Sequence, residues 1–197
     1  MILYSIMILI AWVFIISFNA WLSIPVFHFN IWYIIMATIV STICVIAIDG
    51  ITAGLVRMMP AKWFNPFAKR YKVFKWEKKF YESIGIKKWK DLVPELGHLT
   101  KFRKNKIEDP TNNEYVERFL LEIVYGRVGH VASFFTGFLI IFIFPLEYAF
   151  CFGVPVAIVS VIMNYMPVAI LRYNTPKLMV LHKLNKRKKK KLEVSNA

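Results

Sequence analysis

The chain has 197 residues, of which 57% are hydrophobic, and its formal net charge at pH 7 is +14. A soluble domain is nearer about 45–50% apolar, so the composition argues against an ordinary soluble fold. The length suits a single domain. The basic residues are confined to two stretches. Residues 1–56 contain no Lys or Arg, 17 lie between Arg57 and Arg127, and nine lie between Arg172 and Lys191. This partition is typical of membrane topology, and we expect no nucleic acid as a partner.

Four apolar stretches have the length of about 20 residues that a helix needs to cross a bilayer. They cover residues 2–22, 31–48 with a weaker continuation to 56, 128–146 and 148–171. Short links at 23–30 and 145–148 predict that each pair forms an antiparallel hairpin. The sequence therefore predicts an all-α membrane protein with four transmembrane helices in two hairpins.

The segment 57–127 between the hairpins is basic and rich in aromatic residues. Such mixtures suit a membrane interface, where rings lie at headgroup depth and Lys side chains extend into water. We expect an interfacial helical segment here, and the predicted divisions of the chain are 1–56, 57–127, 128–172 and 173–197, the last being a basic tail. Because the outer links contain no Lys or Arg, both termini and the middle segment are predicted to be cytoplasmic.

This topology brings several polar residues to the cytoplasmic interface. The second span is predicted to end at Asp49 and Gly50, and the fourth reaches Arg172 at the same depth. The third span carries Glu122 and His130 on its cytoplasmic side. A neutral histidine can accept a proton from a hydroxyl nucleophile, so His130 is a candidate general base.

In this hypothesis Glu122 and Asp49 are the carboxylates that orient the base, and Arg172 holds an anionic group. The alternatives remain open: His130 as a structural histidine at a helix end, Asp49 as an ordinary carboxylate, and Arg172 as an anchor at the membrane surface.

The common enzyme signatures are absent. The acyltransferase box, HxxxxD, is missing because Phe135 stands five positions after His130. There is no GxSxG elbow, Walker loop, GxGxxG, HExxH or metal-ligand cluster, so no cofactor and no metal is expected. Cys44 and Cys151 are expected to be small buried apolar residues.

Several short runs resemble one family over residues 51–181. They are Arg57-Met-Met-Pro60, Lys88-Trp89-Lys90, Glu122 with His130, and Arg172-Tyr-Asn-Thr-Pro-Lys-Leu178. The spacing is similar to that of the glycosyl-4,4′-diaponeurosporenoate acyltransferase family, small bacterial membrane proteins of staphyloxanthin-type carotenoid biosynthesis.

The resemblance implies transfer of a fatty acyl group to a hydroxyl of a membrane-embedded glycolipid or isoprenoid glycoside. It implies membrane lipids, an acyl thioester donor and an amphiphilic glycolipid acceptor as partners. The candidates for substrate binding are Arg57, Trp89, Lys90, Arg127, Arg172 and Asn174. A non-catalytic membrane partner or lipid-binding protein remains the alternative, and the sequence leaves the oligomeric state open.

Overall fold

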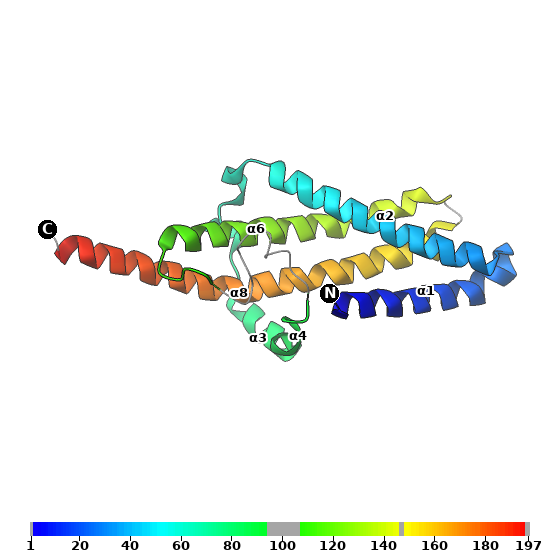
Figure 1. Ribbon diagram of the computed structural model, residues 1–197, viewed down its shortest axis with the longest axis horizontal. Coiled ribbons are helices and arrows are strands. Elements are labelled where there is room, and N and C mark those ends of the chain that lie inside the picture. Colours follow the sequence, from blue (N-terminus) through cyan, green and yellow to red (C-terminus); the bar gives the residue numbers. More distant parts are fainter. Residues whose placement is uncertain (1, 94–106, 146–147, 196–197) are drawn as a thin grey trace. The chain divides into compact units, whose positions relative to one another are not determined.

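The computed structural model describes residues 2–93, 107–145 and 148–195, and their regular elements are all helical (Figure 1). Four helical stretches are long and apolar enough to cross a membrane: Leu3–Phe27, Ile31–Met58, Asn113–Ile143 and Ala149–Ser195. The predicted all-α class with four membrane-crossing helices is confirmed. The chain divides into two compact units. Unit 1 comprises Met1–Met58 and Gly129–Met166, and unit 2 comprises Met59–Val128 and Pro167–Ala197.

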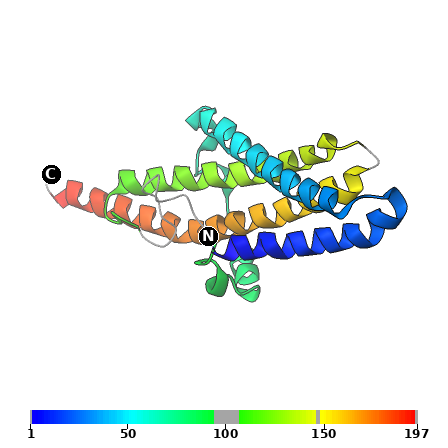
Figure 2. The ribbon, with the colours of Figure 1, turned by 45° about the vertical axis from the view of Figure 1, so that its right-hand side comes forward.

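Unit 1 contains an antiparallel hairpin of α1 (Ile2–Phe27) and α2 (Ile31–Met58), which lie side by side in Figure 2. The turn between them is short: His28 ends α1 and Asn30 begins α2. His28 has a φ of 55° and donates its backbone N–H to the Ile24 carbonyl, as a left-handed residue does after a helix. Asn30 accepts a hydrogen bond from the backbone N–H of Trp32 and so caps the start of α2.

The second helix does not end at Asp49 and Gly50, as one reading of the sequence predicted, because α2 continues to Met58, close to the predicted weaker continuation to 56. A single glycine inside a helix costs only about 1 kcal/mol relative to alanine, and Gly50 therefore does not stop the helix. Asp49 consequently lies within α2, where its side chain faces other helices of unit 1.

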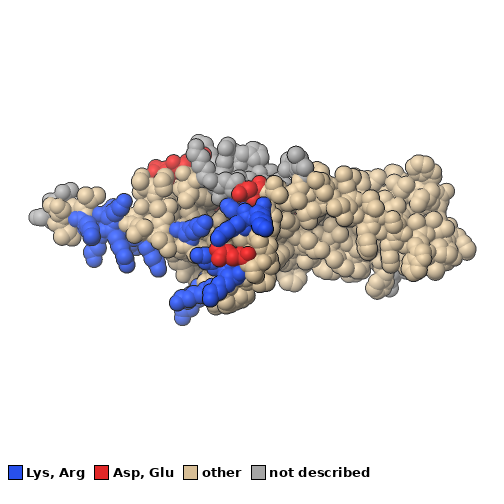
Figure 3. Space-filling model, turned by 90° about the horizontal axis from the view of Figure 1, so that it is seen from below, with Lys and Arg blue, Asp and Glu red and all other residues tan. Residues whose placement is uncertain are grey.

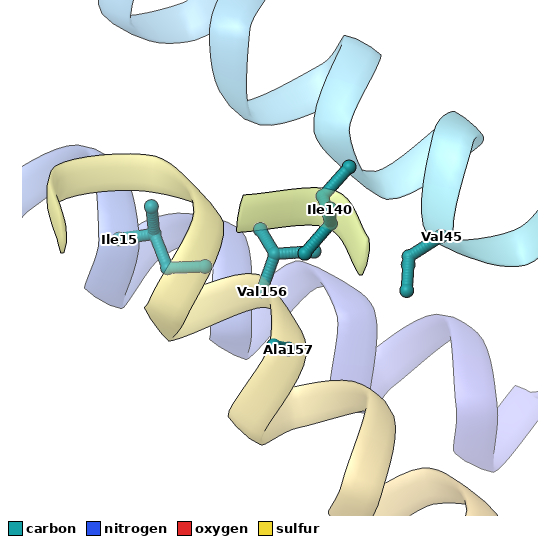
Figure 4. Close-up of a cluster of buried hydrophobic side chains, with 5 residues drawn as sticks. All are labelled: Ile15, Val45, Ile140, Val156 and Ala157. Carbon is teal, nitrogen blue, oxygen red and sulfur yellow. The ribbon is translucent and has the colours of Figure 1, made fainter. Parts of the chain in front are cut away.

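Unit 1 is completed by parts of two helices that continue into unit 2, α6 (Asn113–Thr136) and α8 (Val154–Ser195). Between them lie a 3₁₀ segment, η3 (Gly137–Ile143), and a π-helical turn, η4 (Ala149–Gly153). Side chains from α1, α2, η3 and α8 form one apolar core of unit 1, drawn in Figure 4 and consisting of Ile15, Val45, Ile140, Val156 and Ala157.

A proline in α8 is accommodated by a side chain from α1. Pro167 has no N–H, so the carbonyl of Met163, four residues earlier, lacks its usual helical donor. The Tyr4 hydroxyl donates a hydrogen bond to this carbonyl at 3.0 Å. The bond satisfies a backbone group that lipid could not.

Unit 2 begins with η1 (Ala61–Phe64), η2 (Lys69–Tyr71), α3 (Lys75–Ser83) and α4 (Ile86–Trp89). These short elements are joined to longer helices by ring contacts such as Phe64 stacked on Tyr125, whose centroids are 4.3 Å apart. The core of unit 2 is formed by residues of α6 and α8, namely Val116, Phe119, Leu120, Ile123 and Leu178.

The segment 173–197, expected as a basic tail, continues α8 as a helix to Ser195. Its first part is buried, because Leu178 packs against α6 and His182 stacks on Phe67. Arg57 is the only Lys or Arg of unit 1, so unit 2 carries the other 25 of the 26. On the face shown in Figure 3, the Lys and Arg side chains are accordingly confined to one part of the surface.

Candidate functional site

A hydrogen-bonded chain of three polar side chains lies within unit 1. Asp49 comes from α2, His130 from α6 and Asn164 from α8. The amide of Asn164 joins the other two. Its Nδ2 donates to Asp49 Oδ2 at 2.8 Å, and its Oδ1 lies 2.8 Å from His130 Nδ1. Asp49 and His130, both candidates from the sequence, are thus brought together through a residue that the sequence analysis did not select.

The orientation of the Asn164 amide determines the tautomer of His130. Asn164 Nδ2 also lies 3.1 Å from the Ser160 backbone carbonyl, which can only accept a hydrogen bond. The nitrogen therefore faces Ser160 and Asp49, and the oxygen faces His130. Because that oxygen only accepts, His130 Nδ1 must carry the proton. A neutral His130 then has its lone pair on Nε2, which is the form a general base requires.

The centre of this chain is buried, whereas Asp49 and His130 are partly exposed. Asn164 and Ser160 are 7% and 4% exposed, and the Ser160 hydroxyl donates to Asp49 Oδ2 at 3.3 Å. Among the described residues none donates a hydrogen bond to Asp49 Oδ1. Polar and ionisable groups inside membrane helices are costly and commonly mark a functional site. The same contacts would also hold three helices together, which is the structural alternative.

A second polar cluster lies in unit 2 around Glu77 of α3. Arg172 of α8 binds this carboxylate with two donors, Nε to Oε2 at 2.6 Å and Nη2 to Oε1 at 2.5 Å. Oε1 also accepts the backbone N–H of Phe74 at 2.8 Å, which caps α3, and Oε2 lies 3.4 Å from the Tyr81 hydroxyl. The arrangement is a bidentate ion pair between residues 95 apart in the sequence.

The electrostatics of Glu77 favour its charged form. Burial alone would raise its pKa, but the hydrogen bonds from Arg172 and from the Phe74 backbone, with the charge of Arg172, hold the pKa below its ordinary value of 4.5. Glu77 is therefore ionised at neutral pH, and the pair contributes stability that is present above the ordinary pKa of 4.5 and is lost as the pH falls through the lowered pKa.

Arg127 of α6 belongs to the same cluster of unit 2. Its side chain is buried, and Nη1 donates to the backbone carbonyl of Tyr71 at 2.9 Å. The guanidinium carbon lies 6.0 Å from the centroid of the Tyr71 ring, within the range of a cation–π interaction. Arg127 and Arg172, both predicted to bind substrate, therefore share one site.

The remaining candidates lie elsewhere. Glu122 forms an ion pair with Arg118 at 2.9 Å on α6 of unit 2. The substrate-binding candidates outside the two clusters are Trp89, whose Nε1 donates to the Ile84 carbonyl; Lys90, paired with Asp91; Asn174, half-buried on α8; and Arg57, exposed in the last turn of α2.

Sequence reasoning missed Asn164 and Glu77. The signal for Asn164 was present, because an amide inside the apolar run Val-Ile-Met-Asn-Tyr-Met is expensive in a membrane unless it is bonded. Glu77 was less visible, since it lies among lysines where a carboxylate is ordinary. Only its position three residues after Phe74 indicates a helix-start cap.

Four long apolar helices and buried polar contacts between them define a multi-pass α-helical membrane protein. A family model described as CrtO, glycosyl-4,4'-diaponeurosporenoate acyltransferase, matches residues 60–184, and the chain belongs to this family. The resemblance predicted from the short sequence runs is thereby confirmed. The matched range includes His130 and Asn164 but not Asp49. No curated protein and no solved structure matches the chain.

Proposed function

We propose that this protein transfers a fatty acyl group to a hydroxyl of a membrane-embedded glycolipid, with His130 as the general base. The observation that carries this proposal is the bond from His130 Nδ1 to Asn164, which leaves the lone pair on Nε2. The family description supplies the reaction class, an acyltransferase acting on a glycosylated carotenoid acid. Proton removal by a positioned side chain typically contributes about 10²–10⁴-fold to a rate.

The chemical step needs only a base and an activated acyl donor. His130 Nε2 takes the proton of the acceptor hydroxyl while that oxygen bonds to the acyl carbonyl carbon. With a thioester donor, the carbon–sulfur bond then breaks, and the imidazolium returns the proton to the leaving thiolate. Asn164 keeps the ring in the required tautomer, and Asp49 orients Asn164 in turn.

An amphiphilic acceptor suits a base carried by a membrane helix. Its acyl or isoprenoid part would lie among the lipids and its sugar at the membrane surface. A soluble thioester would reach that surface from the cytoplasm, where the Lys-rich segments are predicted to lie.

The test is complementation of a strain from which the gene is deleted. Wild type, His130→Gln and His28→Gln are expressed to equal membrane levels, and extracted lipids are compared by mass spectrometry. Gln retains hydrogen bonding but has no basicity, so His130→Gln should reduce the acylated glycolipid by about 100-fold or more. His28 is exposed in the turn after α1, and its substitution should leave the product near the wild-type level.

Two outcomes would overturn the proposal. If wild type restores no acylated glycolipid, the protein is not the transferase and a non-catalytic membrane role is favoured. If His130→Gln retains more than about a tenth of the product, His130 is a structural residue that holds helices together.

A further inference from the structure

The cluster of unit 2 contains more positive charge than its carboxylate can pair. Glu77 is ionised, and the guanidinium of Arg172 already binds both of its oxygens. Arg127 and Arg172 donate to consecutive backbone carbonyls, those of Tyr71 at 2.9 Å and Lys72 at 3.4 Å, which places the two side chains close together. A third guanidinium, that of Arg70, lies 5.0 Å from the centroid of the Tyr71 ring, the same ring that Arg127 faces.

Glu77 has no acceptor position left for Arg127. A carboxylate offers about four lone-pair positions. Two are occupied by Arg172, one by the backbone N–H of Phe74 and one by the Tyr81 hydroxyl. No hydrogen bond joins Arg127 directly to this carboxylate in the described part of the chain.

The Arg127 side chain correspondingly makes few hydrogen bonds. It is 5% exposed, yet of its five N–H donors only one has a partner among the described residues, the Tyr71 carbonyl. Glu77 balances part of the Arg127 charge without a direct hydrogen bond, and a guanidinium is held more strongly when several of its donors bind an anion directly. The donors of Arg127 that have no partner among the described residues could therefore bind an anion that the chain itself does not supply.

We propose that Arg127 and Arg172 together bind a phosphate ester. The planar guanidinium fork matches phosphate oxygens, and a tetrahedral phosphate can accept donors from two arginines at once. Glu77 holds Arg172 in place for this role, and the Tyr71 carbonyl and ring hold Arg127. The phosphate would belong either to a soluble acyl carrier such as coenzyme A or to the headgroup of a phospholipid.

The structural alternative is that Arg127 only fastens α6 to the Tyr71 segment. In that case its removal would lower stability and leave anion affinity unchanged. Binding measurements distinguish the two, because they report the anion and not the fold.

Binding is measured on the full-length protein in neutral detergent with two probes. Coenzyme A is titrated by isothermal calorimetry, and dioleoylphosphatidylglycerol is compared with dioleoylphosphatidylcholine by native mass spectrometry. Affinity for coenzyme A identifies a soluble phosphate as the ligand, and selective retention of phosphatidylglycerol identifies a headgroup. If neither probe binds, the proposal is overturned.

The variants are Arg127→Gln and a matched control, Arg118→Gln. Both remove one positive charge from α6, but Arg118 is paired with Glu122 and lies outside the cluster. Arg127→Gln removes a charged hydrogen-bonding partner and should lower the affinity for the probe by about tenfold or more. The control should lower this affinity by less than about twofold. Equal losses in both variants would show diffuse attraction instead of a site.

A measurement on the wild type covers the case in which Arg127→Gln does not fold. Phenylglyoxal modifies accessible arginines, and modified peptides are counted by mass spectrometry with and without the probe that binds. Arg172, whose side chain is 21% exposed, should be protected, whereas Arg118, at 57%, should not. Unchanged modification of Arg172 would refute the site.

Only the coenzyme A arm rests on the proposed acyl transfer. Because binding is measured without turnover, a failure here would leave the test of His130 unaffected. Loss of product in His130→Gln would likewise say nothing about the arginines.

Discussion

At the scale of single residues, Asn164 determines what His130 can do. An imidazole in a membrane helix could carry its proton on either nitrogen, and the amide selects Nδ1 because its own nitrogen is already directed at Ser160 and Asp49. The tautomer of the proposed base is therefore set by a neutral neighbour, Asn164, and Asp49 contacts His130 only through that residue.

We predict that Asn164→Leu lowers both stability and specific activity, and that Asn19→Leu lowers stability alone. Asn19 is the matched control, a buried amide of unit 1 that donates to the carbonyls of Ile15 and Cys151. Each change removes interhelical hydrogen bonds, at a cost of about 0.6–2 kcal/mol. In Asn164→Leu the bond that orients His130 is also lost, so the reaction rate per folded molecule should fall by about a further tenfold.

The measurement is product per folded protein, with folding followed by thermal unfolding in detergent. Equal specific activity in the two variants would mean that Asn164 only joins helices.

At the scale of elements, the close contact between η3 and η4 depends on a glycine. A Cβ on Gly153 would lie 2.8 Å from the Cα of Ile141, a distance that requires the backbone to move. Gly50 in α2 is the opposite case, because a Cβ there would meet nothing within 4 Å. Packing therefore requires a glycine at position 153, whereas no contact among the described residues requires one at position 50.

We predict that Gly153→Ala destabilises the protein by about 1–3 kcal/mol through overpacking. Gly50→Ala should stabilise it by about 0.5–1 kcal/mol, since alanine is the better helix former. Thermal unfolding of both variants in the same detergent measures whether stability falls in Gly153→Ala and rises in Gly50→Ala. A loss of stability in Gly50→Ala would point to a partner packed on that face of α2.

At the scale of the whole molecule, the charge distribution is the main determinant of orientation. Of the two units, one carries a single basic residue, Arg57, and the other carries the remaining 25. The positive-inside rule predicts that the basic segments and both termini lie in the cytoplasm, which we propose as the orientation of the protein. Of the residues in the predicted outer link 23–30, Ser23 is fully buried whereas His28 is exposed, so His28 is the position to label.

We predict that Cys substituted at Lys75 or Lys188 is labelled by a membrane-impermeant maleimide only after the cells are opened. Cys substituted at His28 should be labelled in intact cells. The two native cysteines, Cys44 and Cys151, are first replaced by alanine. Labelling of position 75 in intact cells would contradict the proposed orientation.

The sequence by itself determined the membrane class and the four long apolar helices. Both follow from local composition, because a backbone in lipid must satisfy its hydrogen bonds within a helix, whatever its neighbours. The short runs around His130 and Arg172 also sufficed to predict the family. Helix ends were predicted less well, as the continuation of α2 beyond Asp49 shows, because a lone glycine weakens a helix without ending it.

Only the tertiary structure decided which polar groups meet. Asn164 lies 115 residues from Asp49, and Glu77 lies 95 from Arg172, so no local pattern links either pair. The sequence offered Glu122 and Asp49 equally as partners of His130, yet Glu122 is paired with Arg118. The packing of the helices determines these pairs, because a buried polar side chain must form a hydrogen bond with a group that a neighbouring helix places at the same depth.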